Sequence, residues 1–178
     1  MKRLTPILLL ASAALAAAPA LAASRTSAEA SRAADDALAG DLKVADKIGP
    51  RMAKLRKQID SLASPRATAR SQNTSIRKAL AEVKSIAALL PAVKSALSAA
   101  EGQTGGSGGE QAVDGLASEL ERIRQALEER KKQTESGDTL ENFEIQDLMS
   151  RYNEAESRSS ALLKKVDDTN NSAGSKVG

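Results

Sequence analysis

The most regular hydrophobic pattern in the chain lies near its C-terminal end. There the apolar positions alternate at steps of three and four residues, which places them on one face of an α-helix. The repeating positions are Ile145, Leu148, Tyr152, Ala155, Ser159, Leu162 and Val166. Asp138 and Glu141 stand three residues apart just before this run, as in a capping box at the start of a helix. The pattern therefore predicts one long helix from Asp138 with a single apolar stripe.

A second stripe with the same spacing precedes the first. It consists of Val113, Leu116, Leu120, Ile123 and Leu127. Ser136 and Gly137 follow it, and a glycine directly after a periodic segment is typical of a helix end. The two stripes predict two consecutive helices in this part of the chain.

The first half of the chain carries a longer but interrupted stripe. Its positions are Leu38, Leu42, Ala45, Ile48, Met52, Leu55, Ile59 and Leu62. Gly49-Pro50 is typical of one helix ending and another beginning. The stripe keeps its register across this pair, however, so a single kinked helix is an equally open interpretation. Ser64-Pro65 predicts the end of the segment, because a proline disfavours helical geometry in the residue before it.

One more helix is predicted from about Asn73, with Asn73, Thr74 or Ser75 as its N-cap. Its stripe consists of Ile76, Leu80, Val83, Ala87, Leu90, Val93 and Leu97. Pro91 either kinks this helix or restarts it. No segment alternates with period two between turn signals, so no sheet is expected. The fold class predicted is all-α, with elongated antiparallel helical hairpins in a coiled-coil-like bundle.

Residues 102–109 (GQTGGSGG) contain five glycines in eight positions, a composition typical of a flexible linker. They are not a phosphate-binding loop, because no Lys-Ser or Lys-Thr follows the glycines. The linker divides the chain into a helical half at 23–101 and another at 110–168. The polar residues 169–178 are predicted to be a disordered tail.

The N-terminal residues predict a cleavable signal peptide. Lys2 and Arg3 precede an apolar run from Leu4 to Ala18, and Ala20-Leu21-Ala22 has the pattern of a signal-peptidase site. An uncleaved anchor is the alternative, but the run is shorter than the ~20 residues that span a bilayer. We expect removal of residues 1–22 by cleavage after Ala22, and a periplasmic or secreted bacterial protein. No later segment is expected to cross a membrane.

Large apolar residues are scarce after the predicted cleavage site. Leu, Ile, Val and Phe account for 28 of 156 residues, near the level at which chains tend toward disorder. A thin core predicts stripes that are buried against a partner, either a second copy of the chain or another envelope protein. The residues predicted to make these contacts are Val113, Leu116, Leu120, Ile123, Leu127, Ile145, Leu148, Tyr152 and Leu162.

Charge is divided unevenly along the chain. Residues 23–100 contain 14 basic and 7 acidic side chains, whereas residues 101–178 contain 10 basic and 16 acidic side chains. We therefore expect the basic and acidic halves to attract each other, within one chain or between two chains. The alternative is that the imbalance only reflects solvated helix faces.

Enzymatic chemistry has little support in the sequence. The chain contains no His and no Cys, which removes the usual general base near neutral pH, the thiolate nucleophile and the common zinc ligands. Ser75 and Lys78 match an S-x-x-K pattern, but the other motifs of that enzyme class are missing. We predict no catalytic, cofactor-binding or metal-binding residues, and a protein that is not an enzyme.

One basic segment has the form of a surface-seeking amphipathic helix. In residues 51–59, the cations Arg51, Lys54, Arg56 and Lys57 flank an apolar side. This predicts, as an alternative function, peripheral contact with an anionic membrane surface or envelope polymer. Nucleic acid is not expected, because no aromatic residue stands among these cations. The competing interpretation is that the apolar side belongs to the core stripe.

The function favoured by these patterns is that of an exported structural or protein-interaction component of the bacterial cell envelope. It is expected to act by coiled-coil-like helix association, without catalysis.

Overall fold

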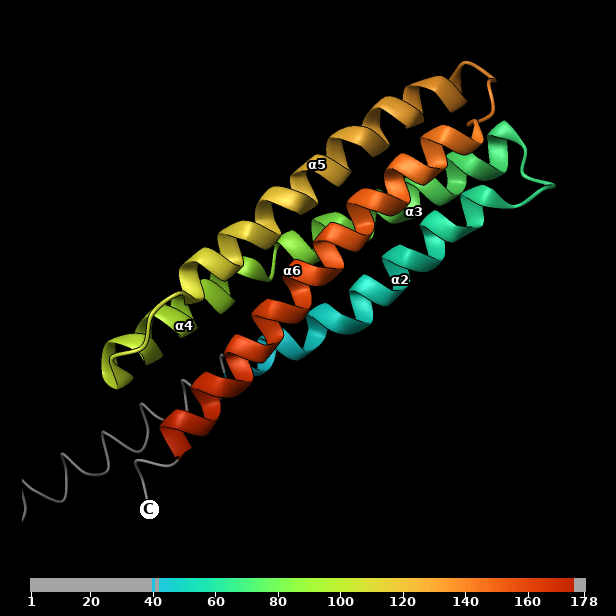
Figure 1. Cartoon of the computed structure of the whole chain (residues 1–178). Helices are drawn as coiled ribbons and strands as arrows, with labels where there is room; N and C mark the ends of the chain where they lie inside the picture. The colour runs from blue at the N-terminus through green and yellow to red at the C-terminus, as the bar shows by residue number, and fades with distance from the viewer. Residues whose placement is uncertain (1–39, 41, 175–178) are drawn as a thin grey trace, which may run out of the picture. The chain divides into compact units, whose positions relative to one another are not determined.

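The computed structural model describes residue 40 and residues 42–174, and this part of the chain is helical throughout, with no strand (Figure 1). The predicted signal peptide lies outside the described residues. The elements are the 3₁₀ turn η1 (Lys43–Lys47), α2 (Ile48–Asp60), the 3₁₀ turn η2 (Ser61–Ala63), α3 (Ala69–Ala87), α4 (Leu90–Thr104), α5 (Gly109–Glu135) and α6 (Asn142–Gly174). The prediction of an all-α fold is confirmed.

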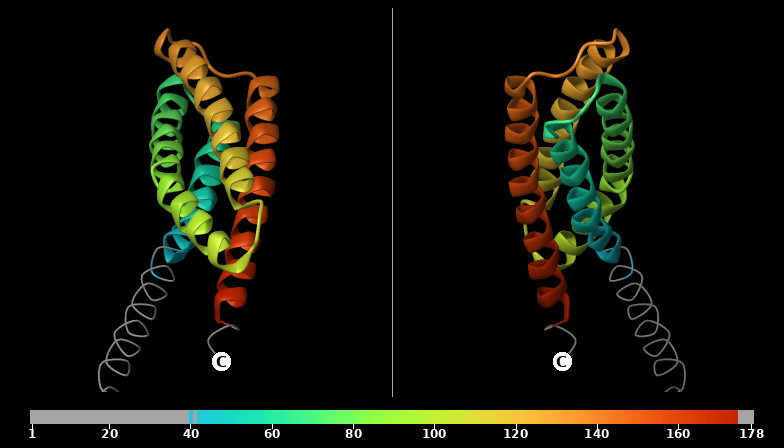
Figure 2. Two further views of the ribbon diagram at one scale, coloured as in Figure 1. Left: turned by 90° about the vertical axis from the view of Figure 1, so that its left-hand side faces the viewer. Right: turned by 90° about the vertical axis from the view of Figure 1, so that its right-hand side faces the viewer.

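The helices form an antiparallel bundle in which consecutive elements are neighbours. α2 packs against α3 and α6, and α5 packs against α3, α4 and α6. Figure 2 shows α3 and α4 following one another along a single side of the bundle. Short connections between antiparallel helices favour this arrangement, which is that of an up-and-down four-helix bundle.

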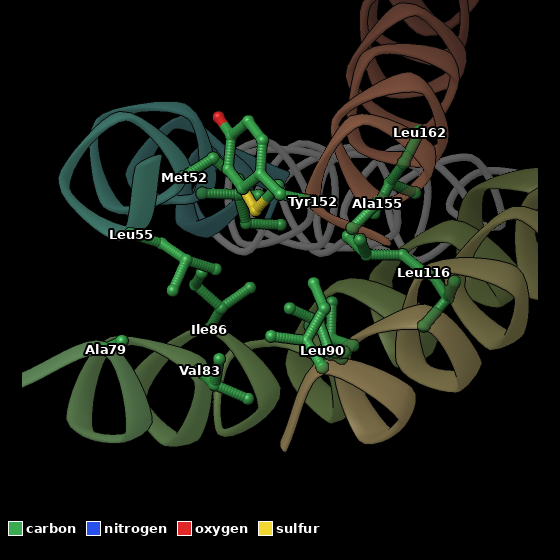
Figure 3. Packing of buried hydrophobic residues seen from close by; sticks show 14 of the residues in the cluster. Met52, Leu55, Ala79, Val83, Ile86, Leu90, Leu116, Tyr152, Ala155 and Leu162 are labelled. Carbon is green, nitrogen blue, oxygen red and sulfur yellow. The ribbon is translucent and has the colours of Figure 1, made fainter. Parts of the chain in front are cut away.

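The interior of the bundle is one continuous hydrophobic core of 29 buried residues. In Figure 3, Tyr152 lies beside Met52, and Leu55 points toward Ile86. Six of the buried residues are alanines, which the count of large apolar residues did not include: Ala45, Ala79, Ala96, Ala100, Ala126 and Ala155. Alanine allows the helices to approach closely, so it fills the interior between the narrow stripes of large apolar residues.

Helix starts differ from the predicted caps. α3 begins at Ala69, and Thr68 and Ser71 form its capping box by accepting hydrogen bonds from each other's backbone N–H. α6 begins at Asn142, where the Glu141 N–H donates to the Glu144 carboxylate at 3.0 Å. The predicted box at Asp138 and Glu141 is thus displaced by three residues, because Gly137 and the following residues form the connection.

The two prolines inside the predicted helices differ in their effect on the chain. No loop interrupts the helical path at Pro50, whereas a new helix begins at Pro91. Pro50 lies in the first turn of α2, and the chain passes directly from η1 into this helix without a loop. Pro91 lies at the start of α4, and only Ala88 and Leu89 separate α4 from α3. Proline fits both places because the first helical turn needs no internal N–H donor.

The glycine-rich segment is mostly absorbed by the helices. Gly102 to Thr104 belong to α4 and Gly109 belongs to α5, so residues 105–108 alone form the connection. Gly105 and Gly108 adopt left-handed φ values of 73° and 98°, which favour glycine over residues with a Cβ. The glycines thus build a tight turn between packed helices instead of a long tether.

The C-terminal tail also differs from its prediction, because α6 continues to Gly174. Thr169 is buried and extends the stripe of this helix by one more step after Val166. Its hydroxyl donates to the Lys165 carbonyl at 2.8 Å. A polar composition therefore did not prevent a helix where one side still contacts the bundle. Residues 175–178 lie outside the described part.

One stretch of the described chain is long and apolar enough, by length and composition alone, to span a membrane. It runs from Ala69 to Gly102, through α3 and α4, with a mean hydropathy of 1.3 in its most apolar window. This corrects the expectation that no segment after the signal peptide passes such a test. Ile76, Val83, Ile86, Leu90, Val93 and Leu97 of this stretch are buried in the bundle interior, and core helices of bundles commonly meet the same criteria.

Candidate functional site

The side chains predicted to bind a partner lie inside the bundle of their own chain. All nine have exposed fractions of 5% or less, and they belong to one core cluster. The stripe at Val113 to Leu127 lies on α5, and the stripe at Ile145 to Leu162 lies on α6. As placed here, these residues contact other helices of the same chain and present no face to another molecule.

The α3 stripe predicted from sequence is shifted in the structure. Ala79 and Ile86 are buried, whereas Leu80 is half-buried and Ala87 is exposed. Leu80 and Ala87 instead border an open groove between α3–α4 and α5. The residues lining this groove are Leu80, Ala81, Val83, Lys84, Ala87, Leu90, Pro91, Lys94, Val113, Asp114, Ala117, Leu120, Glu121, Arg124 and Glu128. Its volume is 680 Å³.

The groove lies beside the bend between α3 and α4. The helical pattern stops at Ala87 and resumes at Leu90, and the Leu89 N–H donates to Ile86 O in the tighter three-residue pattern. Pro91 contributes no N–H to the junction. Small side chains at Ala87 and Ala117 leave space beside this bend that larger residues would fill. A bend and small residues together therefore open the groove.

Charged side chains surround the groove, and most of them are paired. Lys94 Nζ contacts Asp114 at 2.9 Å, and Arg124 donates to both oxygens of Glu121 at 2.7 Å. Hydrogen bonds from Arg124 and Gln125 lower the pKa of Glu121 to about 2. Lys84 is exposed, and no acidic side chain in the described part of the chain forms an ion pair with it.

The basic segment on α2 is split between paired and unpaired cations. Arg51 contacts Glu82 at 3.2 Å, and Arg56 contacts Glu156 at 3.5 Å while lying over the Tyr152 ring, 5.8 Å from its centre. Lys54 and Lys57 are exposed, and neither has an ion pair with any described residue. The apolar side of the segment is Met52, Leu55 and Ile59, all buried in the core. The interpretation of this side as core stripe is the one that the structure supports.

The adjacent helix α3 carries another exposed lysine without an ion pair to any described residue. α2 and α3 touch through Arg51 with Glu82 and through Ser61 with Ser75, whose hydroxyls are 2.7 Å apart. Between these two contacts lie Lys54 and Lys57 on α2 and Lys78 on α3, all exposed. We call these three lysines the basic face.

The uneven charge of the two halves persists in the folded chain. Residues 42–100 contain 12 basic and 3 acidic side chains, and residues 101–168 contain 9 basic and 16 acidic side chains. Ion pairs join the halves within the chain, including Arg77 with Glu135 at 2.9 Å and Lys94 with Asp114 at 2.9 Å. Most basic side chains of residues 42–100 form no ion pair with the acidic half among the described residues.

No group of three His, Cys, Asp or Glu side chains that could hold a metal ion occurs among the described residues. Sequence reasoning missed Lys84 and the groove, and it considered Lys78 only as part of an S-x-x-K pattern. The only signal for the groove was the pair of alanines at 87 and 88 shortly before Pro91, which interrupts the regular stripe.

Comparison of the chain with protein-family models, with curated proteins and with solved structures found no match.

Proposed function

We propose that this chain is an exported, non-enzymatic structural or interaction component of the bacterial cell envelope. The basic start, the apolar run and the small residues at Ala20 and Ala22 support export and cleavage. A sequence without His or Cys supports a binding role over catalysis.

The observation that carries the proposal is the unpaired basic face on an otherwise closed bundle. The helix stripes are already buried within the chain, so contact with another molecule falls to the surface. Lys54, Lys57 and Lys78 hold three exposed positive charges within a few turns of two adjacent helices. The partner that fits this face is an acidic protein surface, since opposite charges steer association and fix its orientation.

The test is site-specific photo-cross-linking in the periplasm. A cross-linker at Lys57 is expected to capture a discrete acidic envelope protein, and Lys54→Glu with Lys78→Glu is expected to abolish that product. Lys132→Glu with Lys164→Glu is the matched control, because both lysines are exposed on α5 and α6 and the charge change is the same. Equal cross-linking in all variants contradicts the basic face as the contact.

Export has its own measurement. The chain expressed in a bacterium is expected in the periplasmic fraction with Ala23 as its first residue, as determined by mass spectrometry of the intact protein. Recovery in the cytoplasm with residues 1–22 attached contradicts this part of the proposal.

A second candidate function is contact with an anionic membrane surface or envelope polymer through Arg51, Lys54, Arg56 and Lys57. The observation in its favour is that Lys54 and Lys57 are exposed and form no ion pair with any described residue. Because Met52, Leu55 and Ile59 are buried, such contact would be electrostatic, without insertion of an apolar side. Salt-sensitive binding to anionic but not neutral vesicles, lost in Lys54→Glu with Arg56→Glu, favours this candidate over a protein partner.

A further inference from the structure

The groove between α3–α4 and α5 has the shape of a channel. On one side its lining runs from Leu80 to Lys94, and on the other from Val113 to Glu128. At a rise of 1.5 Å per residue, each side is about 20 Å long. Its volume is 680 Å³, so the groove is elongated along the two helices.

These dimensions are compatible with a small, elongated ligand. The lining is apolar along most of its length and carries charged side chains at its edge. The volume still lies within the range of about 300–1,000 Å³ that is typical of small-molecule sites. A long, narrow space of this kind fits a single extended hydrocarbon chain better than a compact ligand.

The chemistry of the lining agrees with the shape. The apolar side chains that border the channel come from both sides of it: Leu80, Val83, Ala87, Leu90, Val113, Ala117 and Leu120. They lie beside the α3–α4 bend, where Ala87 and Ala117 are too small to fill the space between them. An apolar groove that remains open in this way gains stability when a hydrocarbon chain displaces its water.

The charges at the edge select the polar end of the ligand. Asp114 is held by Lys94 and Glu121 by Arg124, so these four groups largely neutralise each other. Glu128 lies 4.0 Å from Lys131. Lys84 remains as the cation that lines the groove without an acidic partner among the described residues. One free ammonium beside an apolar channel is complementary to one carboxylate on an apolar chain.

We infer that this groove binds a long-chain carboxylate, with the hydrocarbon chain lying between α3–α4 and α5 and the carboxylate at Lys84. This site is separate from the basic face, and the inference does not depend on the proposed partner contact.

Calorimetric titration of the mature chain with dodecanoate, below its micelle concentration, tests the inference. Saturable binding of one molecule is expected, weakened about fourfold for each methylene removed from the ligand. Dodecyltrimethylammonium, which has an equally long chain and a cationic head, is expected to bind at least tenfold more weakly. Equal binding of the two ligands, or no saturable binding of dodecanoate, overturns the assignment.

Two variants locate the ligand. Lys84→Gln is expected to weaken dodecanoate binding about tenfold and to leave dodecanol binding unchanged. Ala87→Phe places a large side chain in the groove from an exposed position and is expected to abolish binding of both ligands. Lys78→Gln is the matched control, because it removes an exposed lysine of α3 that does not line the groove.

The fold of each variant is checked by its thermal melting curve. Lys84→Gln changes only an exposed side chain, so it keeps the inference testable even if Ala87→Phe disturbs the bundle. Unaltered dodecanoate binding in both folded variants shows that the carboxylate binds elsewhere and overturns the inference.

Discussion

Individual polar residues in the core fix where the helices end and how their connections meet. Gln72 is the clearest example, since it is buried on α3 at the end of the bundle where two connections converge. Its side-chain amide donates to Leu62 O at 3.1 Å, and its Oε1 accepts from the Leu140 N–H at 2.8 Å. One side chain thus satisfies backbone groups from η2 and from the segment before α6, which are far apart in the sequence.

Replacing Gln72 with Leu is expected to destabilise the protein. The substitution leaves the Leu140 N–H and the Leu62 carbonyl buried without this partner, at a cost of about 1–3 kcal/mol. Chemical denaturation measures the change in the free energy of unfolding. Gln111→Leu, at an exposed position of α5, is the control and is expected to change stability by less than about 0.5 kcal/mol. Equal effects of the two substitutions would show that the Gln72 bridge is not formed.

Tyr152 provides a prediction about pH. Burial, followed by the nearby Glu156 carboxylate, raises the pKa of Tyr152 to about 12. In the unfolded chain the phenol titrates near its ordinary pKa of about 10, so the unfolded state loses this proton first as pH rises. The contribution of Tyr152 to stability is therefore fully present below about pH 10 and is lost between about pH 10 and 12.

Absorbance of the phenolate measures this pKa directly, because the chain contains one Tyr and no Trp. The folded protein is expected to titrate near pH 12, and the protein in urea near pH 10. A midpoint near pH 10 for the folded protein contradicts the buried placement of this side chain.

At the scale of the elements, stripes with strict spacing could be predicted from the sequence, and bends could not. Every described position of the stripes assigned to residues 42–62, to α5 and to α6 is buried. On α3 the predicted stripe included Leu80 and Ala87, but Ala79 and Ile86 face the core instead. The spacing alone could not choose between these positions, because alanine is small enough to occupy either side of a helix. Leu80 and Ala87 border the groove because they do not face the core, so the groove could not be predicted from the spacing either.

The connection between α4 and α5 depends on a glycine that composition alone assigned to a linker. Gly109 is buried at the start of α5, and its N–H donates to a Glu101 carboxylate oxygen at 2.8 Å. A Cβ at this position would lie 2.9 Å from the Leu97 Cβ and 3.0 Å from the same Glu101 oxygen. Lys165 of α6 also contacts Glu101, so the contact joins three helices.

Gly109→Ala is therefore expected to lower the free energy of unfolding by about 1–3 kcal/mol, because the added methyl group overpacks the junction. Gly102→Ala, one helix away, is the matched control. A Cβ there meets no atom within 4 Å, so this substitution in α4 is expected to leave stability unchanged or raise it by about 0.5–1 kcal/mol. Denaturant unfolding of both variants measures the difference. A flexible linker at this place would make the two substitutions equivalent.

At the scale of the whole molecule, the sequence predicted helices and charge asymmetry but left their assembly open. Oppositely charged halves could meet within one chain or between two. In the structure they meet within one chain, where α3 packs against α5 and α2 packs against α6. The stripes on Leu116 and Leu148, predicted to face a partner, are fully buried by these contacts. Sequence patterns could not resolve this, because a stripe has the same spacing whether its neighbour belongs to the same chain or to another.

Because the described helices bury their stripes against one another within one chain, we propose that folding requires no partner. This is the reason for placing contact with other molecules on the exposed lysines and in the groove. The free energy of unfolding of a monomer does not depend on protein concentration, whereas that of an obligate oligomer does.

The most direct test is the melting temperature of the mature chain over a roughly thousandfold range of concentration, with sedimentation measured at both ends of the range. We expect one melting temperature throughout and the mass of a single chain. A melting temperature that rises with concentration, together with the mass of an oligomer at the upper end, would contradict the closed bundle.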